Sequence, residues 1–144
     1  MLSRPPRQQL EEAKAHLAAS PPPPDEELDP EIEALVDELI GRVADKWTMI
    51  VTEVLAQHGE MRFTRLSKLV EGISQKMLTK TVRQMERDGL LTRTVHPVIP
   101  PHVEYKLTDM GMSLGAAFCS VWIWAEENYE QIGKARRVFD ERAG

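Results

Sequence analysis

The segment between positions 74 and 88 holds the residues whose types and spacing suit a chemical role. Four cationic side chains recur there every three or four residues: Lys76, Lys80, Arg83 and Arg87. On a helix with about 100° per residue these four gather on one side, opposite an apolar side of Leu78, Val82 and Met85. A cationic stripe backed by a packing face suits the phosphate backbone of nucleic acid, and the alternative is an ordinary solvated helix face.

The N-terminal end of this helix carries the candidates for reading bases. In a DNA-reading helix that end enters the major groove, where glutamine pairs with adenine and lysine with guanine. Gln75 and Thr79 stand between the cationic and the apolar side near this end. We assign base contacts to Gln75, Lys76, Thr79 and Lys80 near this end, and also to Arg83, which follows on the same helix.

A second set of side chains is placed to contact the DNA backbone. Basic residues flank the preceding helix, and the free N–H groups at a Ser74 cap are a suitable partner for a phosphate. Further basic and imidazole side chains lie on a predicted hairpin that would reach the neighbouring backbone or minor groove. The candidates are Arg62, Thr64, Arg65, Ser74, Arg93, His96 and His102. Surface solubility is the alternative for each single arginine.

Helical periodicity and capping residues predict the elements that position these side chains. Asp29 begins a helix over 29–41, and a second helical pattern ends at Gly59. Thr64 is expected to cap a short helix, and Ser74 to cap the longer basic one. A four-residue turn that contains glycine joins these two helices, which is the connection that a helix-turn-helix uses.

From position 90 the hydrophobic pattern changes from helical to alternating. Residues 90–95 and 102–107 are typical of strands, and the prolines between them require a loop. A final long helix, capped by Thr108 or Asp109, is expected to run to about Ile132. With a short strand near Met61, this order predicts a mainly α fold with a small β-hairpin wing, the winged helix-turn-helix.

The chain is predicted to have three parts. Residues 1–28 form a flexible, proline-rich N-terminal extension, since Pro21 to Pro24 end a possible short helix over 8–19. Residues 29–132 form the winged-helix domain for DNA binding and dimerisation. Residues 133–144 form a C-terminal tail.

The net charge of −5 hides an uneven distribution of charge along the 144 residues. Residues 59–106 hold 9 basic and 5 acidic side chains, whereas residues 1–58 hold 5 basic and 12 acidic ones. Residues 107–144 are also acidic, with 4 basic and 6 acidic side chains. A positive middle between negative flanks indicates one face that meets DNA.

The residues and their order resemble the HxlR-type regulators, a MarR-related branch of bacterial winged-helix transcription factors. The resemblance covers roughly residues 32–130, and its motifs are Lys46-Trp47, Met61–Leu66, Gly72–Thr79, Glu86–Leu90, Val95–Tyr105 and Leu107–Gly111. It implies a homodimer in which two recognition helices read a pseudo-palindromic operator in double-stranded DNA. A repressor and a small-molecule effector fit this expectation.

The resemblance also implies that the first helix and the long last helix form the dimer interface. Both predicted helices carry more apolar surface than a small monomer easily hides. The interface candidates are Ile32, Leu35, Val36, Leu39, Leu114, Phe118, Val121 and Trp122. Packing within one subunit is the alternative for Trp122 and Trp124. Several family members sense oxidants through a cysteine near the first helix, but here Cys119 stands alone in the last helix, where packing is the simpler role.

Other classes of function find little support in the residues. The sequence has no phosphate-binding loop and no nucleophile elbow, so we expect neither an enzyme nor a cofactor. His96 and His102 lie beside a proline-containing loop and have no evident acidic third ligand nearby, so we expect no metal site. The start of the chain is not a signal peptide, and no apolar run is long enough to span a membrane, which favours the cytoplasm. The alternative function is a winged-helix module that binds protein partners without specific DNA binding.

Overall fold

The computed structural model describes residues 2–19 and 29–144, which divide into two compact units. The larger one, here called the winged-helix unit, contains residues 29–115 together with residues 2 and 3. The smaller one, here called the helical unit, contains residues 4–19 and 116–144. The proline run that was expected to be flexible, within residues 20–28, lies outside the described residues.

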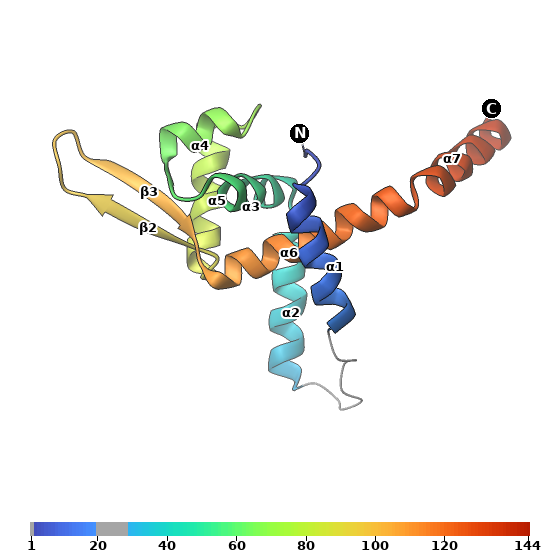
Figure 1. Ribbon diagram of the computed structural model, residues 1–144, viewed down its shortest axis with the longest axis horizontal. Coiled ribbons are helices and arrows are strands. Elements are labelled where there is room, and N and C mark those ends of the chain that lie inside the picture. Colours follow the sequence, from blue (N-terminus) through green and yellow to red (C-terminus); the bar gives the residue numbers. More distant parts are fainter. Residues whose placement is uncertain (1, 20–28) are drawn as a thin grey trace. The chain divides into compact units, whose positions relative to one another are not determined.

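The described elements are helices apart from one small sheet (Figure 1). In chain order they are α1 (Arg7–Ala19), α2 (Pro30–Val43), α3 (Lys46–His58), β1 (Met61–Arg62), α4 (Phe63–Leu69), α5 (Gln75–Arg87), β2 (Leu91–His96), β3 (His102–Leu107), α6 (Asp109–Glu127) and α7 (Tyr129–Ala143). The mainly α, winged helix-turn-helix fold predicted from the sequence is confirmed. None of the described helices is long and apolar enough to cross a lipid bilayer.

The core of the winged-helix unit fixes α5 against α3, α4 and the sheet. Val51 of α3, Leu66 of α4 and Leu78 of α5 are completely buried in one apolar cluster. Burying an aliphatic side chain of this size contributes roughly 1.5–3 kcal/mol of transfer free energy. The apolar side of α5 that the sequence predicts is therefore the side that holds the helix in place.

Capping residues set the ends of α2, α3 and α5. The Asp29 carboxylate accepts from the backbone N–H of Glu31 at 2.9 Å, and the Ser74 hydroxyl accepts from that of Met77 at 3.0 Å. A cap of this kind contributes about 1 kcal/mol. After α5 the chain turns at Gly89, whose φ of 77° is in the left-handed region that favours glycine.

The entry to α4 corrects one prediction. Thr64 was expected to cap this helix, but α4 begins at Phe63 and Arg62 occupies the N-cap position. Arg62 lies opposite Glu104 in the backbone pairing of β1 with β3, so its own backbone is extended. The chain therefore passes directly from strand to helix, without a separate capping residue between them. Thr64 therefore lies in the first turn of α4.

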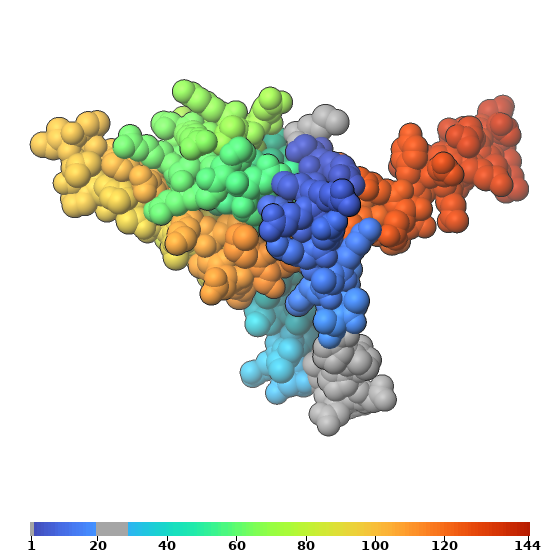
Figure 2. All heavy atoms as spheres, in the orientation of Figure 1, coloured from blue at the N-terminus to red at the C-terminus, as the bar shows by residue number. Residues whose placement is uncertain are grey.

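The wing is an antiparallel hairpin of β2 and β3, and β1 adds to the other edge of β3. The register runs from Leu91 opposite Leu107 to His96 opposite His102. Residues 97–101 connect the strands, as the prolines predict. In Figure 2 the wing stands out in yellow and orange from the green helices of the same unit.

The C-terminal helices differ from the prediction of one helix to about Ile132. The first helix, α6, ends at Glu127 and a second helix, α7, covers Tyr129–Ala143, so the predicted domain boundary at 132 falls inside α7. The break is at Asn128, whose side-chain amide donates to the carbonyl of Trp124 at 2.8 Å. An asparagine that bonds its own preceding turn competes with continuation of the helix.

The helical unit contains α1, which lies in the segment that was expected to be an extension. Leu10 and Ala13 of α1 are buried in a small apolar cluster with Cys119 and Ile123 of α6. The helix that the sequence pattern suggests over 8–19 is therefore present as Arg7–Ala19 and packs through one apolar side. Cys119 is buried, with 6% of its surface exposed, in agreement with the packing role.

Candidate nucleic-acid interface

Helix α5 presents its basic residues to solvent and its apolar residues to the core. Leu78, Val82 and Met85 are at most 1% exposed. The opposite side consists of exposed side chains: Lys76, Lys80, Arg83 and Arg87. We call these four residues the cationic face. The apolar side of the same helix is packed in the core, so the backbone positions that carry these four charges are fixed.

Helix α5 carries the five predicted base-reading residues, four of them near its N-terminal end. Gln75, Lys76 and Thr79 are exposed within the first two turns, and Lys80 and Arg83 follow on the same exposed side. The Ser74 hydroxyl before them accepts the hydrogen bond that caps the helix. A hydroxyl that accepts in this way still has a proton to donate, for instance to a phosphate oxygen.

The residues predicted to contact phosphate before the turn lie together at the start of α4. Arg62, Thr64 and Arg65 are all exposed there. Arg62 ends β1, and Thr64 and Arg65 lie in the first turn of α4, the helix that precedes the turn into α5. This end of α4 therefore adds cationic groups to the winged-helix unit that also carries the cationic face.

An ion pair that the sequence did not predict fastens the other end of α5. The Arg42 guanidinium, on the last turn of α2, contacts Asp88 at 2.7 Å and also pairs with Glu38. The side chains of Arg42 and Asp88 are only 19% and 12% exposed. A paired charge in such a protected place holds the C-terminal end of α5 to α2.

The wing separates the three residues that the sequence groups there. Arg93 lies opposite Tyr105, whose side chain is buried, whereas His96 lies opposite His102 on the other face of the hairpin. Alternate residues of a strand point to opposite faces, so Arg93 does not share a face with the two histidines. The hairpin thus offers a cationic group on one face and imidazoles on the other.

The two imidazoles lie against Glu104, a residue absent from the candidates chosen on sequence. The His96 and His102 rings stack with centroids 4.6 Å apart. Glu104 Oε2 lies 3.2 Å from His96 Nε2, and Glu104 Oε1 lies 3.3 Å from His102 Nε2. Strand alternation could have predicted that Glu104 lies beside His102, because residues 102 and 104 of one strand must share a face.

Opposing influences act on the Glu104 carboxyl. Desolvation raises its pKa, while the charge of His96, hydrogen bonds with Glu60 and His96 and the charge of His102 lower it. The net effect places the pKa of Glu104 below its usual value. The group is therefore ionised near neutral pH.

The candidate dimer residues differ in how much of them is exposed. Ile32, Leu35 and Val36 of α2 are 42–54% exposed, and α2 has no buried residue. Val121 of α6 is 54% exposed, and the half-buried candidates are Leu39, Leu114, Phe118 and Trp122. Large apolar side chains left exposed along a helix mark a surface suited to association.

Comparison with known proteins identifies the family. Residues 42–133 match the HxlR-like helix-turn-helix family. The chain belongs to this family. The matched range contains the whole helix-turn-helix and the wing. In this chain α1 and almost all of α2 precede the matched range.

Relatives of this HxlR-like protein are transcriptional regulators. It is 35% identical over 106 residues to the HTH-type transcriptional regulator YtfH of Escherichia coli strain K12, which covers 74% of this chain and 81% of that protein. It is 35% identical over 109 residues to YdeP of Bacillus subtilis strain 168, and the match covers 74% of this chain and 84% of YdeP. A solved structure described as a MarR-family transcriptional regulator from Enterococcus faecalis V583 is 31% identical, with a TM-score of 0.62 and coverage of 74% and 94%. This HxlR-like chain is therefore a transcriptional regulator of the helix-turn-helix type.

Proposed function

We propose that this regulator binds double-stranded DNA with sequence specificity, acts as a homodimer on a pseudo-palindromic operator and represses transcription. One observation carries the proposal: the cationic face of α5 is exposed on a helix whose opposite side is locked into the core. A rigid helix with such a face fits the major groove, as recognition helices do.

The proposal divides the contacts into two kinds. Arg62, Arg65 and Arg93 bind phosphates and set the position of each subunit. Base edges are read by five side chains of α5: Gln75, Lys76, Thr79, Lys80 and Arg83. Because several phosphates are neutralised, the affinity falls steeply as the salt concentration rises.

A dimer places two α5 helices on two half-sites. The apolar surfaces of α2 and α6 support an association of two copies. Half-sites read by a two-fold dimer lie about 34 Å apart, or a multiple of that distance. A ligand that alters the separation of the two α5 helices would then change operator affinity.

Replacement of Lys80 tests the DNA-reading role. Lys80→Ala removes one groove contact and is expected to weaken operator binding by about 1–3 kcal/mol, or roughly 5- to 150-fold. Lys134→Ala, which removes an exposed lysine from α7, is the matched control and leaves affinity unchanged. The operator is first obtained by selection from random DNA, and affinities are measured by fluorescence anisotropy.

The same measurements address the alternative of a protein-binding module. That alternative predicts no enriched sequence and no complex that survives competitor DNA. Equal affinities of Lys80→Ala and the unmodified protein would remove Lys80 from the reading residues. A selection that yields no sequence would overturn specific DNA binding altogether.

A further inference from the structure

The outer end of the wing brings three metal-ligating side chains together on one face. His96 ends β2, His102 begins β3, and the two residues are directly opposed in the register. Glu104 follows His102 by two positions and therefore shares its face. The three residues come from both strands at the base of the 97–101 loop, so the hairpin itself assembles the cluster.

The spacing of the donor atoms suits a single small cation. One ligand atom from each residue can be chosen so that all three lie within 4.8 Å of one another. The two contacts between imidazole nitrogen and carboxylate oxygen are 3.2 and 3.3 Å. Two ligands bound at about 2.1 Å in tetrahedral geometry lie roughly 3.4 Å apart, and each imidazole nitrogen lies close to this distance from one of the two Glu104 oxygens.

The donor set defines the class of ion. Two imidazole nitrogens and one carboxylate oxygen suit a borderline divalent transition metal such as Zn²⁺, whereas Ca²⁺ and Mg²⁺ prefer oxygen ligands alone. Three protein ligands leave a fourth position for water.

The cluster is also accessible without being freely mobile. The side chains of His96, His102 and Glu104 are 38%, 20% and 26% exposed, which leaves a route for an ion. The backbone under them is a paired antiparallel ladder rather than a loose loop. A site on rigid elements loses less conformational freedom when it binds.

We propose that His96, His102 and Glu104 form a binding site for one divalent transition metal ion on the wing. The ion links the two strands at their last pair before the loop, and water completes its coordination. Metal binding of this kind does not depend on whether the protein binds DNA. The site lies on the face of the hairpin opposite to Arg93.

Titration with Co²⁺ and Zn²⁺ tests the site on the full-length protein. Co²⁺ is expected to bind one ion per chain with a visible absorption band, and Zn²⁺ is expected to displace it. His96→Gln, His102→Gln and Glu104→Gln are each expected to weaken Zn²⁺ binding at least tenfold in calorimetry. His58→Gln, which changes an exposed histidine on α3, is the matched control and leaves binding unchanged.

A second measurement uses the unmodified protein, so it stands even if a variant folds poorly. Zn²⁺ is expected to shift the imidazole proton resonances of His96 and His102 in NMR spectra, and not those of His58. Absence of a one-to-one complex would overturn the site. So would Zn²⁺ binding that persists in the His96→Gln and His102→Gln double variant, or an equal loss of binding in His58→Gln.

Discussion

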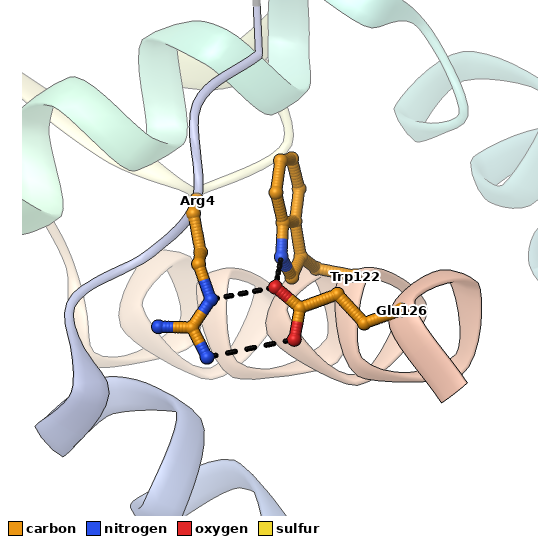
Figure 3. A network of polar contacts seen from close by, with 3 residues as sticks. All are labelled: Arg4, Trp122 and Glu126. Atoms are coloured by element: carbon orange, nitrogen blue, oxygen red, sulfur yellow. Dashed lines mark hydrogen bonds and ion pairs between the residues drawn. The ribbon is translucent and has the colours of Figure 1, made fainter. Parts of the chain in front are cut away.

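At the scale of single residues, Glu126 shows how one carboxylate organises its surroundings. Its Oε1 atom accepts from Arg4 Nε at 2.6 Å and from the Trp122 indole N–H at 2.7 Å (Figure 3). The other oxygen, Oε2, lies 3.5 Å from a second guanidinium nitrogen of Arg4. The segment before α1 is thereby joined to α6 within the helical unit.

These contacts predict a pH-dependent signal. Hydrogen bonds from Arg4 and Trp122 lower the pKa of Glu126 below its ordinary value of 4.5. The stabilisation of the folded protein by these contacts is therefore complete above the ordinary pKa of 4.5. It is lost as the pH falls through the lowered pKa of Glu126 in the folded state. We expect the Trp122 indole N–H resonance to move with a midpoint below pH 4.5, as followed by NMR.

The control is Glu126→Gln, whose amide oxygen still accepts from Trp122 but does not titrate. In this variant the Trp122 resonance should stay in place over the same pH range. The indole resonances of Trp47 and Trp124 provide a reference within each spectrum. A midpoint at or above pH 4.5 would contradict the role given to Arg4.

The grouping of side chains on one surface was predictable from the sequence where all of them lie on one helix. Lys76, Lys80 and Arg83 are four and three positions apart, so helical periodicity alone puts them on one side. The partnership of Arg42 with Asp88 joins residues 46 positions apart, and no periodicity relates them. Pairs of this kind follow from tertiary structure and were not predictable.

At the scale of elements, the junction between the wing and α6 depends on a close backbone contact. The Thr108 hydroxyl donates to the carbonyl of Gly89 at 2.6 Å and accepts from the N–H of Gly111 at 3.1 Å. A Cβ atom on Gly111 would lie 2.0 Å from the carbonyl oxygen of Leu90. Only glycine fits here, because a contact of that length forces the backbone to move.

Two alanine substitutions in α6 therefore have opposite expected effects. Gly111→Ala is expected to destabilise the protein by about 1–3 kcal/mol, since overpacking displaces the backbone. Gly115→Ala, one helical turn later, places its Cβ 3.5 Å from Thr52, which is an ordinary contact. It is expected to stabilise the protein by up to about 1 kcal/mol through helix propensity.

Urea unfolding followed by circular dichroism measures both variants at one protein concentration. Gly115→Ala is the matched control, because it makes the same chemical change in the same helix. Equal stabilities of the two variants would show that the Gly111 contact is not needed.

Most elements were predictable, and the failures have physical reasons. The hairpin followed from alternating residues on both sides of a proline-containing loop. The end of α6 did not, because residues on both sides of Asn128 continue a helical pattern and only a side-chain bond marks the break. The start of α4 was displaced because strand pairing by Arg62 replaced a cap.

At the scale of the whole molecule, charge and apolar surface have separate locations along the chain. The net charge is −5, yet residues 59–106 are positive and contain both α5 and the wing. Exposed apolar side chains are prominent on α2 and α6. The proposed function assigns the positive region to DNA and the apolar surfaces to a second copy, and regional charge and helical periodicity in the sequence predict the same division.

The proposed homodimer predicts that one charge on α2 separates the subunits. Leu35 is 54% exposed, and Leu35→Glu would bury a carboxylate in the interface without a partner. In analytical ultracentrifugation we expect the unmodified protein to have twice the chain mass of 16.4 kDa. The variant is expected to have the mass of one chain. Leu17→Glu, on the comparably exposed Leu17 of α1, is the matched control and remains a dimer.

Operator binding then separates dimer loss from loss of DNA reading. A dimer gains affinity because binding of one α5 helix raises the effective concentration of the other at the second half-site. Leu35→Glu should therefore lose affinity for a two-half-site operator while keeping the weaker affinity for a single half-site. A Leu35→Glu dimer would show that α2 lies outside the interface, and an unmodified protein of single mass would refute the homodimer.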